Sequence, residues 1–258
     1  MRSTLMRRTA RLSTSLAPRS RMMSSKVRAT PAEAVEDVVD GSSLLVGGFG
    51  LSGVPEALLR AVREKGSKNL TVVSSNVGTG ERGLGLLFQT KQISKMVGSY
   101  VGENDIFEQQ FLNGEIEVEL VPMGTLAERM RAAGAGIPAF YTPTGVGTVV
   151  AEGKDERVFG GKRAILEEAL PARWAFIRAH RGDTYGNLQF YGTTRNFQIA
   201  MAMAAEITIA EIDELVPLGA IPADDVHLPG IFVQRIFEAK DHLDPVEHIT
   251  TRPRPSDA

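Results

Sequence analysis

Short apolar runs alternate with amphipathic segments along most of the chain. Ser43-Leu-Leu-Val-Gly-Gly is an apolar run that ends in glycines, which is typical of a buried strand. In the next segment, 54–65, Leu58, Leu59 and Val62 recur at helical spacing. Strands that alternate in this way with helices across short links favour an α/β fold. We therefore predict a single domain with an open, mostly parallel sheet and helices on both faces.

The same pattern predicts a series of further elements, but its texture changes past residue 137, where glycine and proline become frequent. Residues 152–161 form a charged, glycine-containing insertion in that part of the chain. The predicted helices are 31–39, 54–65, 84–90, 104–112, 124–133 and 197–205. The predicted strands are 43–48, 69–74, 94–100, 116–121 and 207–211, with two more, 174–179 and 187–190, joined by a wide loop.

Residues 47–53 hold four glycines in seven positions, with a phenylalanine among them. In an open α/β sheet the ligand lies beyond the carboxyl ends of the strands, and residues 74–78 follow the next strand at the same edge. Glycines let a ligand approach the backbone closely, and free N–H groups can face a carboxylate, phosphate or thioester oxygen. The sequence therefore predicts that both segments face a ligand.

Two other interpretations of the glycine loop are open. Residues 48–53 match the GxGxxG pattern of dinucleotide-binding folds, which also need an acidic residue at the end of the next strand. That strand ends in Ser74-Ser-Asn76, so the pattern lacks its carboxylate. A purely structural role in turning the chain accounts for two of the glycines and not for four.

The N-terminal segment differs in composition from the rest of the chain. Residues 1–30 contain seven Arg, one Lys, six Ser and four Thr, and the first acidic residue is Glu33. This composition is typical of a mitochondrial transit peptide and predicts a location in the mitochondrial matrix, whereas a basic tail is the alternative. We expect a transit peptide at 1–27, the folded domain at 28–245 and a flexible tail at 246–258.

Composition limits the remaining chemistry. The 258 residues carry a formal net charge of −2, and 43% of them are hydrophobic. Without the eight N-terminal cations, 21 basic residues face 31 acidic ones, so nucleic acid has no general electrostatic attraction to the body. No stretch is long and apolar enough for a membrane span. With no cysteine and four histidines outside any HExxH pattern, we expect no metal site.

The segment Asp40–Pro55 resembles the signature of the α half of the class I coenzyme A transferases. The resemblance covers about residues 30–240 and continues in several motifs in the right order. Those further motifs are Gly83–Leu87, Ser99–Asn104, Leu112–Leu120, Gly124–Arg129, Gly134–Thr142, Gly186–Leu188 and Arg195–Phe197. Within the family, the chain is most similar to members that use succinyl-CoA and 3-oxo acids.

The resemblance implies a ping-pong reaction that moves CoA from succinyl-CoA to a small 3-oxo acid such as acetoacetate, as in ketone body catabolism. A glutamate of the β half, in a Ser-Glu-Asn-Gly motif, carries the CoA as a thioester. This chain lacks that motif, and Glu103 belongs to the α pattern itself, so we expect no catalytic residue here. The implied partner is a β subunit or β half in an α2β2-type assembly. No cofactor is implied, because the CoA thioester is a substrate.

Two positions depart from the family pattern. Related members carry Asn-Asn where this chain has Ser75-Asn76, and Gln where it has Met123. A serine keeps one donor for a substrate carboxylate, whereas methionine offers an apolar surface instead. The residues expected to face substrate or CoA are Gly47, Gly48, Phe49, Gly50, Gly53, Pro55, Ser75, Asn76, Gly78, Met123 and Gly124.

Two other classes of function stay open at this point. A sugar-phosphate isomerase-like relative would share the sheet and a glycine loop, and would carry its own acid/base pair at the strand ends. A non-catalytic remnant that binds CoA or an acid would lack the nucleophile, as this chain does. The presence or absence of a β chain separates this last class from half of a working transferase.

Overall fold

The computed structural model describes residues 25–240, which form a central sheet, six helices and a small second sheet. The helices are α1 (Pro31–Ala34), α2 (Glu56–Lys65), α3 (Gly85–Gln89), α4 (Asp105–Leu112), α5 (Met123–Gly134) and α6 (Gln198–Ala204). The strands of the central sheet are β1 (Ser43–Val46), β2 (Leu70–Val73), β3 (Ile93–Gly98), β4 (Glu117–Leu120), β8 (Ala172–Asp183), β9 (Leu188–Gln189), β10 (Ala205–Val216) and β11 (Arg235–Glu238). Short 3-10 turns lie at Val149–Ala151, Gly192–Arg195, Ala223–Asp225 and Gly230–Phe232.

The central sheet runs in the order β11-β10-β8-β1-β2-β3-β4. All neighbours in this path are parallel, and β9 pairs antiparallel with β8. The strands at its centre are apolar because both of their faces are covered; Leu44, Leu45 and Val46 of β1 are each at most 1% exposed. The predicted fold class, a mostly parallel α/β sheet in one domain, is confirmed.

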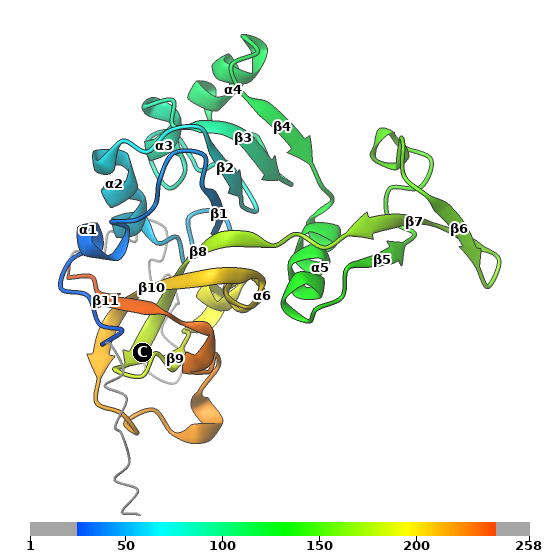
Figure 1. Ribbon diagram of the computed structural model, residues 1–258. Helices are drawn as coiled ribbons and strands as arrows, with labels where there is room; N and C mark the ends of the chain where they lie inside the picture. The colour runs from blue at the N-terminus through cyan, green and yellow to red at the C-terminus, as the bar shows by residue number, and fades with distance from the viewer. Residues whose placement is uncertain (1–24, 241–258) are drawn as a thin grey trace, which may run out of the picture.

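Helices cover both faces of this sheet (Figure 1). Alternate residues of each strand enter two separate apolar clusters, as the two-residue period of a strand requires. Leu44 and Val72 pack with α1, α2, α3 and α4, whereas Leu45 and Val73 pack with α5 and α6. The carboxyl ends of β1, β2 and β3 are thereby left to the loops that follow them.

The sequence pattern located most elements of the body to within a few residues, with three differences. Strand β10 runs for 12 residues where 207–211 was expected, because it pairs along the whole of β8. Strand β11 was not predicted, since four residues carry little periodicity. The two strands predicted at 174–179 and 187–190 are found as β8 and the much shorter β9.

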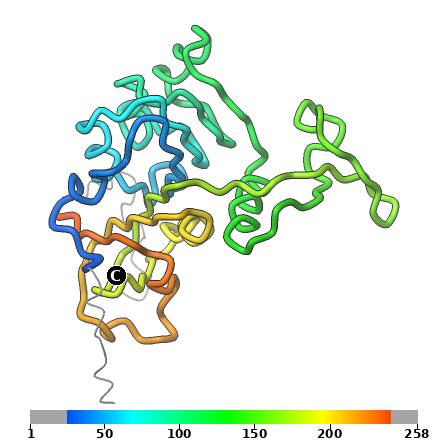
Figure 2. Tube along the Cα trace, in the orientation of Figure 1, coloured from blue at the N-terminus to red at the C-terminus, as the bar shows by residue number. Residues whose placement is uncertain are grey.

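The second sheet forms an arm, residues 139–168, that stands out from the body in Figures 1 and 2. Its antiparallel strands are β5 (Ala139–Thr142), β6 (Glu156–Phe159) and β7 (Lys162–Glu168), in the order β5-β7-β6. The expected insertion at 152–161 therefore contains a strand and a hairpin turn. Gly160 and Gly161, both at positive φ, form the two-residue connection between β6 and β7.

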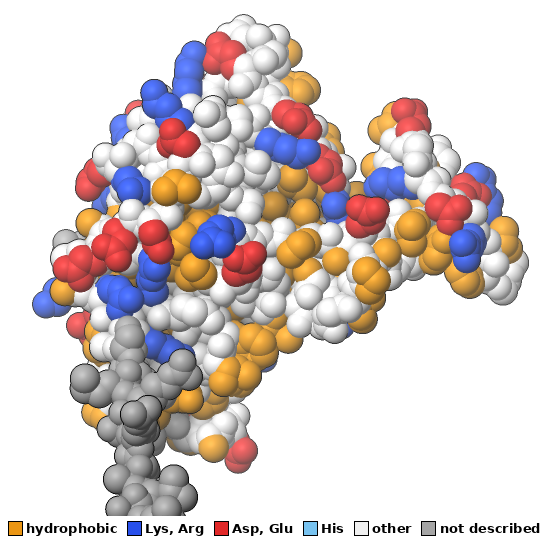
Figure 3. Space-filling view, in the orientation of Figure 1, with side chains coloured by type: hydrophobic (Ala, Val, Ile, Leu, Met, Phe, Trp, Pro, Cys, Tyr) orange, Lys and Arg blue, Asp and Glu red, His pale blue; other side chains and the backbone are white. Residues whose placement is uncertain are grey.

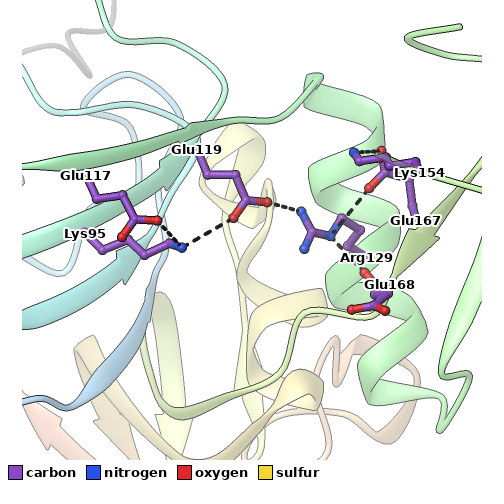
Figure 4. A network of polar contacts seen from close by, with 7 residues as sticks. All are labelled: Lys95, Glu117, Glu119, Arg129, Lys154, Glu167 and Glu168. Carbon is purple, nitrogen blue, oxygen red and sulfur yellow. Dashed lines mark hydrogen bonds and ion pairs between the residues drawn. The ribbon is translucent and has the colours of Figure 1, made fainter. Parts of the chain in front are cut away.

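Charged side chains fasten the root of the arm to the body (Figure 4). Arg129 of α5 binds Glu119 of β4 at 2.7 Å and donates through Nε to the Glu168 carbonyl at 2.8 Å. Glu167 of β7, only 2% exposed, accepts from Lys154 at 2.6 Å and lies 4.0 Å from Arg129. The root of the arm is thus fixed by a network of charges that reaches back to the sheet edge.

Residues 1–24 and 241–258 lie outside the described part of the chain, so most of the predicted transit peptide and the predicted tail do too. The last residues of the predicted transit segment are described: Lys26 donates to the Gly230 carbonyl at 2.6 Å, and Val27 bridges to Ile236 of β11. Within residues 25–240, no helix combines the length and apolar character that crossing a bilayer requires.

Candidate functional site

Three loops at the carboxyl ends of β1, β2 and β3, together with the start of α5, surround a pocket of about 390 Å³. Its lining residues are Phe49, Gly50, Ser75, Asn76, Gly78, Thr79, Tyr100, Glu103 and Met123. Six of these were predicted from the sequence, whereas Thr79, Tyr100 and Glu103 were not. The structure therefore brings the two predicted segments and Met123 together at one edge of the sheet.

The other predicted residues do not line this pocket. Gly47, Gly48, Gly53 and Pro55 are buried behind the loop tip. Gly124 is exposed in the first turn of α5, and a Cβ built there meets nothing within 4 Å. Their glycines answer to neighbouring protein atoms or to backbone conformation, as the contacts below indicate.

The glycine loop, Gly47–Gly53, forms a tight turn with its tip at the pocket. The Phe49 N–H donates to the Ser52 carbonyl at 3.0 Å, and the Ser52 N–H donates to the Phe49 carbonyl at 3.1 Å. Between them Gly50 has φ +59°, a left-handed conformation that favours glycine. Within residues 25–240, the N–H groups of Gly50 and Leu51 have no partner, so the tip keeps donors for a ligand.

The polar side chains after β2 hold this loop. Ser75 is 1% exposed and donates its hydroxyl to the Gly48 carbonyl at 2.9 Å. Asn76 donates through Nδ2 to the Gly50 carbonyl at 3.2 Å and to Ser75 Oγ at 2.9 Å, and its Oδ1 accepts the Gly78 N–H. The donor that the sequence assigned to a substrate carboxylate at Ser75 is thus directed at the protein's own backbone.

A second set of contacts reaches the loop from the segment before α6. The Asn196 side chain accepts the Gly48 N–H and donates to the Ser52 carbonyl, both at 3.2 Å. Gln198 donates to the Gly53 carbonyl at 2.7 Å. Neither amide was identified as a site residue from the sequence, although the Arg195–Phe197 motif carries Asn196. Only the fold places this segment, about 145 residues away in the sequence, against the loop.

The N-terminus of α2 is occupied by a carboxylate. Glu211 of β10 is 2% exposed, and its Oε2 accepts the N–H groups of Ala57 and Leu58 at 3.0 and 3.3 Å. In a dinucleotide-binding fold the pyrophosphate uses these first N–H groups of the helix. A buried carboxylate at that place repels phosphate, so the loop does not offer the phosphate site that its GxGxxG pattern suggests.

The pocket wall is largely apolar. Phe49, 55% exposed, stacks on Phe197 with ring centroids 6.3 Å apart, and Tyr100 and Met123 form other parts of the wall. Glu103 supplies the one carboxylate among the lining residues and has φ +63° directly before the N-cap of α4. No histidine lines the pocket, so the lining lacks the acid/base pair expected of an isomerase-like relative.

Metal binding finds no support in the described residues. No group of three or more His, Asp or Glu side chains within 25–240 is placed to hold a metal ion. The lining groups are instead N–H donors, aromatic faces, a thioether and one carboxylate. Such a wall suits an acyl group with a carbonyl oxygen at the loop tip.

Known proteins share this sequence and fold. The coenzyme A transferase family model matches residues 28–239. The chain is 53% identical over 220 residues to one named subunit of succinyl-CoA:3-ketoacid coenzyme A transferase from Helicobacter pylori, covering 85% of this chain and 95% of that relative. It is 44% identical over 243 residues to human mitochondrial succinyl-CoA:3-ketoacid coenzyme A transferase 2, covering 87% of this chain and 47% of the human protein.

The fold recurs in a solved structure. The acyl-CoA transferase of Escherichia coli O157:H7, in a thioester complex with CoA, superposes with a TM-score of 0.76 over 85% of this chain and 48% of that one. At 22% identity this likeness concerns the fold alone. Both here and in the human comparison, the chain spans about half the length of the protein it matches.

Proposed function

This chain belongs to the coenzyme A transferase family, and from that premise we propose that it is the α half of an enzyme that moves CoA from succinyl-CoA to a small 3-oxo acid such as acetoacetate. The observation that carries the proposal is the match to a bacterial transferase subunit over nearly its whole length. The pocket at the strand ends supports it, since its donors and apolar wall suit an acyl group.

The proposed chemistry has two symmetrical halves. A glutamate carboxylate attacks the succinyl thioester, releasing CoA thiolate and forming a mixed anhydride; the thiolate then attacks the glutamyl carbonyl and releases succinate. The 3-oxo acid carboxylate next attacks the glutamyl thioester, and the thiolate returns to the new acyl group. The N–H groups of Gly50 and Leu51 support the carbonyl oxygen on which negative charge develops.

The nucleophilic glutamate is proposed to come from a partner. A β subunit with a Ser-Glu-Asn-Gly motif, in an α2β2-type assembly, supplies the carboxylate that this chain lacks. Two observations support this: the name of the H. pylori relative describes one subunit of a transferase, and the human relative is about twice as long as the matched region. No resident cofactor is proposed, because the thioester itself conserves the energy of the reaction.

The test of this function combines the chain with its partner. Co-expression with a chain carrying Ser-Glu-Asn-Gly should give CoA exchange between succinyl-CoA and acetoacetate with ping-pong kinetics, and hydroxylamine should trap a thioester on the partner. Each chain alone should be inactive. An assembly that binds CoA without transferring it would favour the non-catalytic remnant, and a thioester on this chain alone would make Glu103 the residue to replace.

We also propose that the protein acts in the mitochondrial matrix. The acid-free, arginine-rich composition of residues 1–30 supports import, as does the likeness to mitochondrial relatives at 42–44% identity. Bacterial relatives are more similar, at 53–59%, so the argument rests mainly on composition. A fluorescent reporter fused to residues 1–30 should accumulate in mitochondria, and a diffuse cytosolic signal would contradict the proposal.

A further inference from the structure

One buried amide lies at the base of the glycine loop. Gln198, the first residue of α6, is fully buried. Its Nε2 donates to the Gly53 carbonyl at 2.7 Å, and its Oε1 accepts the Arg178 N–H of β8 at 3.2 Å. The amide therefore joins the end of the loop to the strand that pairs with β1.

The glycines at both ends of the loop are fitted to this amide. A Cβ on Gly47 would lie 2.7 Å from Gln198 Cδ and closer still to Oε1, and a Cβ on Gly53 would lie 2.9 Å from Nε2. These separations are shorter than real Cβ contacts. Because the φ of Gly47 lies outside the left-handed region, its backbone would accept alanine if the amide were absent. Glycine at this position is therefore required by Gln198.

Asn196 makes an equivalent connection nearer the tip. Its side chain spans the loop from the Gly48 N–H to the Ser52 carbonyl, both at 3.2 Å. Together the two amides close the loop below its tip, although neither lines the pocket. The positions of Phe49 and Gly50 on the pocket wall are set from behind by these side chains.

We propose that Gln198 is a positioning residue of the acyl-transfer site, holding the glycine loop so that Phe49 and the Gly50 N–H face the reacting acyl group. The inference rests on the proposed function and adds to it a residue that does not contact the substrate. Donors aimed at developing charge act only from a fixed place, and a misplacement of about 1 Å costs roughly 10²-fold in rate. A glycine-rich loop has few side chains with which to fix itself.

The test uses the full chain assembled with its β partner. Gln198→Leu keeps most of the side-chain volume and removes both hydrogen bonds. We expect kcat to fall roughly 10²-fold with little change in KM for acyl-CoA, because interactions made only in the transition state appear in kcat. The purified assembly should keep its size and its folded circular-dichroism spectrum at the assay temperature.

Gln92 provides a matched control at the opposite end of the sheet. It is 1% exposed, precedes β3, and donates to the Val62 and Ser67 carbonyls at 2.9 Å each. Gln92→Leu therefore also removes a buried amide from backbone partners. It should lower the thermal midpoint about as much as Gln198→Leu does and leave both kcat and KM at the wild-type values.

A double substitution tests the fit between Gln198 and the loop directly. Gly47→Ala alone displaces the amide and should lower kcat. In the Gln198→Ala background the methyl group occupies vacated space, so adding Gly47→Ala should cost no further activity, and the two effects are not additive. Additive losses would mean that Gly47 does not sense Gln198.

Hydrogen exchange of the loop amides separates the possible failures. Exchange within 47–55 should be faster in Gln198→Leu than in wild type or Gln92→Leu. A wild-type assembly without any transfer would contradict the proposed function, whatever the exchange shows. Normal transfer by the wild type, together with a Gln198→Leu variant that keeps its kcat or its slow loop exchange, would overturn the positioning role alone.

Discussion

The glycine-loop edge of the body and the arm are held by different forces. Around the loop, side chains are buried and neutral hydrogen bonds tie one backbone segment to the next, as Ser75 and Gln198 do. In the arm, all four residues of β6 are exposed, with Phe159 at 54%. What fixes the arm is the charged network at its root, centred on Glu167.

The difference lies in how much apolar surface each region buries. The body buries two clusters, one on each face of its sheet, whereas the arm buries little beyond Ala164 and Ile165. A three-stranded sheet with so small a core depends on what it is attached to. Figure 3 shows the arm as a separate projection that carries exposed apolar and charged side chains side by side. The body should therefore respond to changes in packing, and the arm to changes in charge.

The largest effect is expected from a side chain placed in the packed loop. Gly53 has φ +71°, and a Cβ there would lie 2.9 Å from the Thr194 carbonyl and from Gln198. Gly53→Val combines left-handed strain with overpacking, so we expect a loss of about 3 kcal/mol in the free energy of unfolding and loss of transferase activity. Denaturant titration of the assembly measures the first, and the CoA-exchange assay measures the second.

Gly50→Ala is the control for this substitution. Gly50 also has a positive φ, +59°, but a Cβ there meets nothing within 4 Å. It should therefore cost only the conformational term of about 1 kcal/mol. Equal destabilisation by the two substitutions would mean that packing behind Gly53 contributes nothing.

The arm should respond most to the loss of its buried charge. Glu167→Gln leaves Lys154 without its carboxylate partner at 2.6 Å and weakens the contact with Arg129. We expect the free energy of local opening of residues 139–168 to fall by about 2 kcal/mol, since hydrogen bonds to charged groups contribute about that much. Limited proteolysis should then cleave the arm faster while the body stays intact.

An exposed pair in the same sheet gives the comparison for Glu167. Glu156 and Arg163 are bonded to each other on the arm surface, where the side chains are 32% and 60% exposed. Glu156→Gln should change arm cleavage little, because exposed ion pairs contribute at most about 1 kcal/mol. If both variants open the arm equally, the buried network is not what holds its root.

The same contrast explains which parts could be predicted from the sequence. Strands such as β1 and β2 are buried on both faces, so their apolar runs are unambiguous. Strand β6 is exposed throughout, and its sequence, Glu156–Phe159, has no buried face to give it a period. Its signal was the Gly160-Gly161 turn, which marks a hairpin only when the flanking residues are recognised as strands.

At the pocket, local motifs predicted the loops but not their partners. The glycines and the Ser75-Asn76 pair are visible in the sequence, and both segments do lie at the same edge. Their hydrogen bonds to each other, and to Asn196 and Gln198, depend on contacts between segments far apart in the chain. Sequence reasoning assigned the Ser75 donor to a substrate because the competing acceptor, the Gly48 carbonyl, becomes a neighbour only after folding.

A smaller effect is expected from one neutral hydrogen bond in the loop. Ser75→Ala removes the donor to the Gly48 carbonyl and should cost about 1 kcal/mol of stability, with a measurable fall in kcat. Its neighbour Ser74 is 4% exposed and donates to the Val46 carbonyl of β1 at 2.9 Å. Ser74→Ala should have the same stability cost and unchanged kcat. A fall in kcat in both variants would extend the site into the strand.

The smallest effect should come from an exposed ion pair of the body. Arg235 of β11 donates to both carboxylate oxygens of Asp37, at 2.5 and 2.7 Å, and these bonds hold the pKa of Asp37 below its ordinary value. A carboxyl group with a lowered pKa stabilises the fold at pH values above its unfolded pKa. That contribution is lost as the pH falls through the folded pKa, below about pH 4.

Asp37→Asn removes this contribution at every pH. Because the Asp37 side chain is 49% exposed, we expect a difference from wild type of less than about 1 kcal/mol at pH 7, shrinking toward zero in acid and in 1 M salt. Urea titrations of the assembly at pH 7 and near pH 2.5 measure it. A difference of 2 kcal/mol or more at neutral pH would mean that the body, like the arm, depends on charge, and the comparison between the two regions would fail.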